Sequence, residues 1–141
     1  MNTLTLPGGL AAAFLPDDDG HGCRLLAGRC RCDGRHFFPL RAYCPQCLEP
    51  LEVVPLAGRG KIYATTTVRT KAPFGLPEPY AIGYVDLADV DLRVFGLFSP
   101  DSLDGLRPDR EVELNLIPMG MDGGGKPCLR PVFRLTGGEH D

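Results

Sequence analysis

The stretch KIYATTTVRT, residues 61–70, predicts the fold more directly than any other part of the chain. Its side chains fall into two alternating sets, Ile62, Ala64, Thr66 and Val68 against Tyr63, Thr65, Thr67 and Arg69. A period of two with many β-branched residues is typical of a β-strand that exposes one face. We therefore expect a strand over this whole stretch.

Four later stretches repeat this pattern: residues 80–86, 92–98, 111–117 and 129–135. Residues 89–91 suit a turn between the second and third strands, and residues 99–110 leave room for one short helical turn between the third and fourth. Five short antiparallel strands favour a small closed barrel, because closure removes the exposed sheet edges. The sequence predicts a mainly β protein with a five-stranded oligonucleotide/oligosaccharide-binding (OB) barrel.

The composition of the chain is that of a small globular protein. The chain has 141 residues, 43% of them hydrophobic, with 18 glycines and 14 prolines, which favours short elements joined by turns. Its net charge of -3 argues against a protein that binds nucleic acid through bulk electrostatics. No apolar run is long enough to span a membrane, and the N-terminus lacks the basic start of a secretory signal. We expect a cytoplasmic protein.

The composition changes along the chain predict three segments. Residues 1–22 are expected to form an N-terminal arm, with a short helix or docking arm around the apolar run 10–15 or simply a partly ordered end. Residues 23–55 are expected to form a small zinc ribbon, and residues 56–141 the OB barrel with a C-terminal tail. Residues 50–60 are expected to be a linker between ribbon and barrel.

Four of the six cysteines have a spacing that indicates a metal site. In Cys44-Pro45-Gln46-Cys47, two thiolates three positions apart can hold one tetrahedral Zn²⁺ from a tight turn. The upstream half is Cys30-Arg31-Cys32-Asp33-Gly34, where either Cys32 supplies the fourth thiolate or Asp33, three residues after Cys30, supplies an oxygen. A closed site of four protein ligands is structural, so we assign it no catalysis. The alternative is a metal-free ribbon stabilised by Phe37 and Phe38.

The remaining chemical motifs are interpreted as structural. Cys23 and Cys128 lie outside the cysteine cluster and are expected to be buried rather than nucleophilic. The glycine-rich stretch 120–127 resembles a phosphate-binding loop, but Pro127 stands where such a loop needs Ser or Thr. We expect a hairpin turn there.

Three stretches of the chain resemble one known family: LLAGRCRCDG at 25–34, FFPLRAYCPQC at 37–47 and GRGKIY at 58–63. It is the family of small acyl-CoA-associated proteins with a rubredoxin-like zinc ribbon followed by an OB fold, known as domain of unknown function thirty-five. Residues 72–87 look like the same family's second barrel strand, so the resemblance covers residues 25–117. This chain departs from the family pattern at Asp33, where the family has a cysteine directly before the glycine.

The resemblance implies a non-catalytic subunit of a thiolase-fold enzyme complex of the thiolase, acyltransferase or aldolase type. Such a subunit would help to seat the CoA ester and to organise the partner's active site. The side chains around the ribbon that suit CoA phosphates and adenine are Arg29, Arg35, His36, Arg41 and Phe38. The implied cofactors are a structural Zn²⁺ and an acyl-CoA ligand shared with the partner. The alternative for these arginines is that they only solvate a small ribbon.

A protein that binds single-stranded nucleic acid is the rival hypothesis. OB barrels commonly present aromatic and basic side chains to a strand, and the candidates here are Tyr63, Arg69, Lys71 and Tyr84. The negative net charge, the absence of Trp and the lack of a basic run in the barrel argue against it.

Replacement of Cys44 by Ala is expected to release the metal and unfold the ribbon. A small metal-organised module has little apolar core to hold it once a ligand is lost. The measurement is the zinc content of the purified variant together with its binding to a partner. Full retention of zinc and partner would contradict the metal hypothesis.

Overall fold

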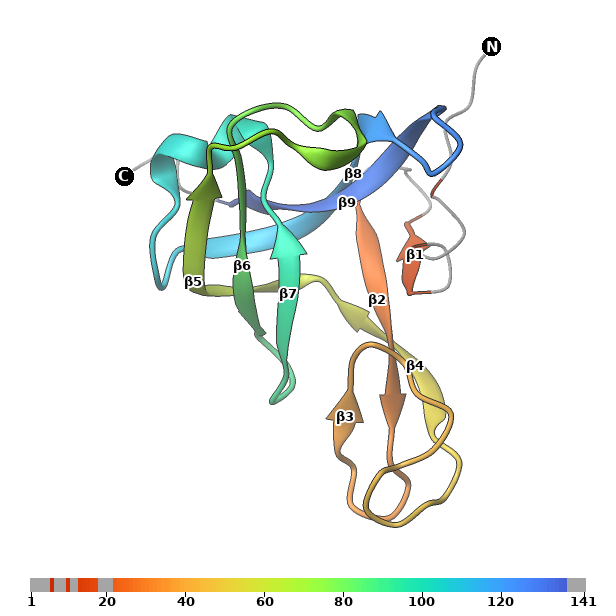
Figure 1. Cartoon of the computed structure of the whole chain (residues 1–141). Helices are drawn as coiled ribbons and strands as arrows, with labels where there is room; N and C mark the ends of the chain where they lie inside the picture. Colours follow the sequence, from red (N-terminus) through yellow and green to blue (C-terminus); the bar gives the residue numbers. More distant parts are fainter. Residues whose placement is uncertain (1–5, 7–9, 11–12, 18–21, 137–141) are drawn as a thin grey trace.

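Two antiparallel β-sheets make up the computed structural model, which describes residues 6, 10, 13–17 and 22–136 (Figure 1). The first sheet has order β1-β2-β3, with β4 also paired to β2; its strands are β1 (Phe14–Pro16), β2 (Cys23–Arg29), β3 (His36–Phe37) and β4 (Glu52–Ala57). The second has order β7-β6-β5-β8-β9, with β5 (Arg59–Val68), β6 (Tyr80–Leu87), β7 (Arg93–Leu97), β8 (Glu111–Met121) and β9 (Pro127–Leu135). The two short 3-10 helices are η1 (Pro73–Gly75) and η2 (Pro100–Gly105). The predicted mainly β fold is confirmed.

The five-stranded sheet curls so that its two ends meet. Just beyond β7, Phe98 forms a parallel bridge with Phe133 of β9, and the Ser99 N–H donates to the Phe133 carbonyl at 2.8 Å. All five barrel strands predicted from periodicity are present, and the predicted helical turn between the third and fourth is η2. The expected OB-like architecture is therefore confirmed.

The glycine-rich stretch forms the predicted hairpin turn between β8 and β9. Within it, Asp122 Oδ1 accepts hydrogen bonds from the backbone N–H groups of Gly124 and Lys126 at 2.9 and 3.0 Å. Gly125 has a φ of 81°, a conformation that favours glycine. These contacts account for the motif without a phosphate.

The prediction of a linker over residues 50–60 is wrong. Residues 52–57 form β4, which pairs with β2 from Arg29↔Glu52 to Arg24↔Ala57. Pro55 is tolerated because β4 pairs with a strand on one side only, so its missing N–H breaks no ladder. The boundary expected between residues 55 and 56 falls inside this strand.

Part of the predicted N-terminal arm is a strand. Residues 14–16 form β1, in which Phe14 pairs with Leu25 of β2, where a short helix or arm was the expectation. The remainder of the arm (1–5, 7–9, 11–12, 18–21) and the tail residues 137–141 lie outside the described residues.

The alternation expected through residues 61–70 is interrupted by a β-bulge between Ile62 and Ala64. Ile62 is buried opposite Val85, whereas Ala64 is exposed opposite Tyr84. One extra residue in a strand reverses which set of side chains faces the core. The predicted strand is therefore present, but its alternation is not continuous through the bulge.

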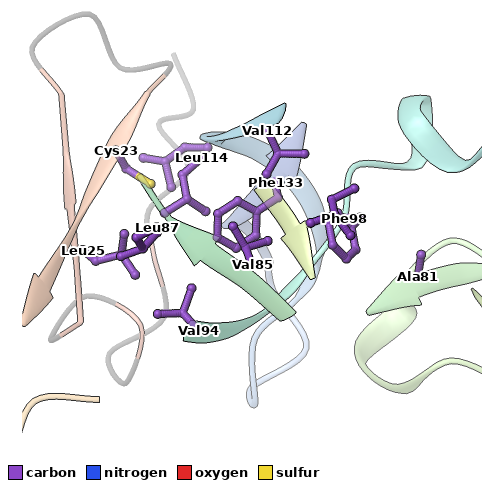
Figure 2. Close-up of a cluster of buried hydrophobic side chains, with 12 residues drawn as sticks. Cys23, Leu25, Ala81, Val85, Leu87, Val94, Phe98, Val112, Leu114 and Phe133 are labelled. Atoms are coloured by element: carbon purple, nitrogen blue, oxygen red, sulfur yellow. The ribbon is translucent and has the colours of Figure 1, made fainter. Parts of the chain in front are cut away.

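The two sheets share one hydrophobic core. Phe98 and Phe133 are the largest of its fully buried side chains, and their rings lie 6.1 Å apart. From the first sheet, Cys23 and Leu25 of β2 pack into this cluster, and Figure 2 shows them beside Leu114 and Leu87. Within the described residues, no helix is long and apolar enough to cross a membrane.

Replacing Phe133 by Ala is expected to lower the free energy of unfolding by about 3–5 kcal/mol, since the ring is buried and leaves a cavity. The matched control is Phe95→Ala, whose ring is 56% exposed and packs edge-on against Tyr84. This control should lower the free energy of unfolding by less than about 1.5 kcal/mol. Denaturant unfolding of both variants makes the comparison, and equal losses would contradict the assignment of the core.

Candidate functional site

The loop after β2 and the loop before β4 lie at the end of the first sheet that is away from the barrel (Figure 1). They carry Cys30, Cys32, Cys44 and Cys47, which together we call the thiol cluster. The sulfur atoms of Cys30, Cys32 and Cys47 all lie within 4.8 Å of one another, and those of Cys30 and Cys47 are 3.5 Å apart. Two thiolates on one tetrahedral zinc are about 3.8 Å apart, given Zn–S bonds of about 2.3 Å. The fourth, Cys44, is buried, and its sulfur interacts with those of Cys47 and Cys30.

Two tight loops carry these residues, at 30–35 after β2 and at 44–49 before β4. In the first, the Cys30 N–H donates to the Arg35 carbonyl at 2.8 Å, and the Gly34 N–H donates to the Cys30 carbonyl at 2.8 Å. The second loop repeats both bonds: Cys44 donates to Glu49 at 2.9 Å, and Leu48 donates to Cys44 at 2.9 Å.

Backbone hydrogen bonds favour the anionic forms of Cys44 and Asp33. The pKa of the Cys44 thiol is lowered, chiefly by hydrogen bonds from the backbone N–H groups of Cys47 and Gln46. The pKa of the Asp33 carboxyl is lowered by the Arg35 N–H, which donates to its Oδ1 at 2.9 Å, and then by the Cys30 thiol. A set of soft thiolates on two closed turns fits Zn²⁺.

The residues expected to contact CoA differ in their surroundings. Arg29 pairs with Glu52 at 3.3 Å, and Phe38 packs edge-on against Phe14, with ring centroids 5.7 Å apart, at the margin of the core. Arg41 is exposed and lies over the Phe37 ring at 5.8 Å. Arg35 is the last residue of the first loop; it is exposed, and its Nε lies 4.0 Å from Asp33 Oδ2. His36 is half-buried on β3, opposite Arg29.

A second feature, on the outer side of β5, β6 and β7, is an aromatic face formed by Tyr63, Tyr84, Phe95 and Arg93 with Asp86. Tyr84 and Phe95 are opposite one another in the sheet, 45% and 56% exposed, with ring centroids 5.3 Å apart. The Arg93 guanidinium lies 3.3 Å from the centre of the Tyr63 ring.

The aromatic face has little net charge, because its arginine is paired within it. Arg93 donates two hydrogen bonds to the Asp86 carboxylate, at 2.6 and 3.2 Å. Sequence reasoning had singled out Tyr63 and Tyr84 but missed Phe95 and Arg93. The signal was present in the period-two spacing of these two residues on β7.

Comparison with known proteins relates both halves of this architecture to characterised proteins. The family model described as the C-terminal OB-fold domain of ChsH2 matches residues 53–116. The benzoylsuccinyl-CoA thiolase subunit BbsA of Thauera aromatica is 36% identical over 119 residues, which cover 82% of this chain and 79% of that protein. This chain belongs to the DUF35 family.

Two further relatives agree with this membership. A DUF35 domain-containing scaffold protein of Methanocaldococcus jannaschii is 35% identical over 69 residues, 46% of this chain and 48% of that protein. Among solved structures, the Ltp2-ChsH2(DUF35) aldolase matches with a TM-score of 0.64 and 23% identity, covering 79% of this chain and 84% of that chain. The latter likeness concerns the fold. The DUF35 resemblance expected from the sequence is confirmed.

The buried thiol of Cys23 predicts a dependence of stability on alkaline pH. Burial, with a smaller effect of Asp17, raises the pKa of this thiol from 9.0 to about 12. Above pH 9.0 the unfolded chain releases a proton that the folded chain keeps, so the free energy of unfolding falls as pH rises toward 12, by about 1.4 kcal/mol per pH unit. Cys23→Ala should lack this part of the slope in denaturant titrations. Parallel slopes for variant and wild type would contradict the assignment.

Proposed function

We propose that this chain is a non-catalytic accessory subunit of an acyl-CoA enzyme complex of the thiolase type, which includes thiolases, acyltransferases and aldolases. The observation that carries the proposal is the 36% identity with BbsA, a protein named as a thiolase subunit, over most of both chains. A second BbsA, from Geobacter metallireducens, is equally similar over 117 residues.

The chemistry of the described cysteines supports a non-catalytic role. Cys23 and Cys128 are buried, and the raised pKa of Cys23 keeps its thiol protonated and a poor nucleophile. The other four cysteines belong to the thiol cluster, where Cys30, Cys44 and Cys47 would be bound to the metal. The catalytic acid, base and nucleophile would then belong to the partner subunit.

The aromatic face is our proposed docking surface for that enzyme subunit. Tyr, Phe and Arg side chains that are exposed in one chain and pack in a complex contribute most to binding at protein interfaces. Because Arg93 is neutralised by Asp86, the surface complements an apolar protein patch better than a phosphate backbone. The same neutralisation weighs against the rival hypothesis of single-stranded nucleic-acid binding.

The proposed cofactor is one Zn²⁺ bound by Cys30, Cys44 and Cys47 with a fourth ligand from Cys32 or Asp33. Bound zinc supplies no reaction step here; it would hold the two loops together. Between residues 30 and 51 only Cys30 and Cys44 are buried, so the loops have almost no apolar core of their own.

For the CoA ester, Arg35 and Arg41 are the side chains we propose for phosphate contact, with His36 beside them. Both arginines are exposed, and a guanidinium can bind a phosphate through two parallel hydrogen bonds. Arg29 and Phe38 have weaker support, because one is paired with Glu52 and the other packs on Phe14. The proposed organisation is an N-terminal arm that adds β1 to the first sheet, a zinc ribbon that extends to the end of β4 at Ala57, and an OB barrel after it. The proposed location is the cytoplasm, a reducing compartment that keeps thiols free.

Purification of the tagged full chain from its native host tests the proposal. We expect a thiolase-type enzyme in stoichiometric amount, zinc in the same sample, and acyl-CoA turnover that falls when this chain is left out. Recovery of nucleic acid without an enzyme would favour the rival hypothesis.

The docking surface has its own test in Phe95→Ala, which should weaken binding to the enzyme subunit by about tenfold or more, since aromatic residues central to an interface carry much of its binding energy. The matched control is Phe74→Ala, whose ring on η1 is equally exposed, at 54%, but lies outside the aromatic face. Calorimetric titration of both variants gives the affinities. Unchanged affinity for Phe95→Ala would remove the aromatic face from the interface.

A further inference from the structure

The two loops of the thiol cluster are copies of one turn. Position by position, Cys30 corresponds to Cys44 and Gly34 to Leu48: each cysteine makes the same two backbone hydrogen bonds, and φ is 76° at Gly34 and 63° at Leu48. A left-handed conformation is uncommon for leucine, so its presence at the glycine's place shows how closely the second loop follows the first.

The two loops also make equivalent hydrogen bonds to the sulfur of their first cysteine. The Cys30 sulfur accepts from the backbone N–H groups two and three residues later, those of Cys32 and Asp33. The Cys44 sulfur accepts from the equivalent groups of Gln46 and Cys47. Cys32 is therefore the counterpart of Gln46, whose side chain has no thiol.

The decisive position is the third after the leading cysteine, where Asp33 corresponds to Cys47. The Cys47 sulfur accepts a hydrogen bond from the backbone N–H two residues on, that of Glu49. The Asp33 carboxylate accepts the equivalent bond from Arg35, at 2.9 Å, and it also interacts with the Cys30 thiol. The carboxylate thus accepts in the first loop the backbone hydrogen bond that the second thiolate accepts in the second loop.

We infer that the metal is bound by Cys30, Asp33, Cys44 and Cys47, with the carboxylate of Asp33 as the one oxygen ligand. The inference rests on the metal part of the proposed function. A carboxylate oxygen is an accepted zinc ligand, and three thiolates with one carboxylate carry the same charge as four thiolates. Cys32 is then an exposed thiol beside the ion, within 4.8 Å of the Cys30 and Cys47 sulfurs but outside the ligand set.

X-ray absorption of the zinc-loaded full chain counts the ligands directly. We expect three sulfurs at about 2.3 Å and one oxygen at about 2.0–2.2 Å from zinc. Asp33→Cys should change this to four sulfurs, and Cys32→Ser should leave it unchanged. Four sulfurs in the wild type, falling to three in Cys32→Ser, would overturn the inference while leaving a zinc site in place.

Chelator competition supplies an independent readout. Loss of a residue that only hydrogen-bonds to a metal ligand lowers metal affinity about 10- to 100-fold. Because Asp33 is inferred to be a ligand itself, Asp33→Asn should lower the zinc affinity at least tenfold. Cys32→Ser also removes one potential donor, but its zinc affinity should stay close to that of the wild type. Greater loss for Cys32→Ser than for Asp33→Asn would overturn the inference. A wild-type chain that takes up no zinc would overturn it together with the metal part of the proposed function, while the accessory-subunit part is tested separately by the enzyme that co-purifies.

Discussion

The arrangement of the molecule depends on one strand, β2, which belongs to both parts of the structure. Its first residues, Cys23 and Leu25, are buried in the barrel core, and its last, Arg29, leads directly into the thiol cluster. Along its length β2 pairs with β1, β3 and β4. Because a paired strand is stiff, burial at one end sets the position of the thiol cluster at the other.

The thiol cluster and the barrel are stabilised by different physical means. The barrel buries large apolar side chains such as Phe98 and Phe133, whereas the loops between residues 30 and 51 bury only two cysteines. A segment of this size without a core depends on cross-links or on a metal for its order. The backbone N–H groups aimed at Cys44 and Asp33 already prepare anionic ligands for such an ion.

The β-bulge after Ile62 adjoins the aromatic face, because it places the exposed Ala64 opposite Tyr84. The rings of Tyr84 and Phe95 are exposed beside it. An accessory subunit needs a surface of this kind, since it acts through what it contacts rather than through its own reaction. The neutral pairing of Arg93 with Asp86 gives the surface the low charge that protein interfaces favour.

The five barrel strands, a helical turn within residues 99–110, the hairpin at 120–127 and the candidate metal-binding cysteines could be predicted from the sequence, because each is a short-range pattern of period, spacing or turn chemistry. The remaining features depend on contacts made in the folded chain. Two of these features join residues far apart in the chain: the pairing of β4 with β2 and the Arg93–Tyr63 contact. A third is the bulge in β5, which leaves no local signature in the sequence. The inferred preference for Asp33 over Cys32 likewise depends on a comparison with the second loop. Residue spacing leaves both side chains as candidates, whereas in the folded loops Asp33 accepts the backbone hydrogen bond equivalent to that of Cys47.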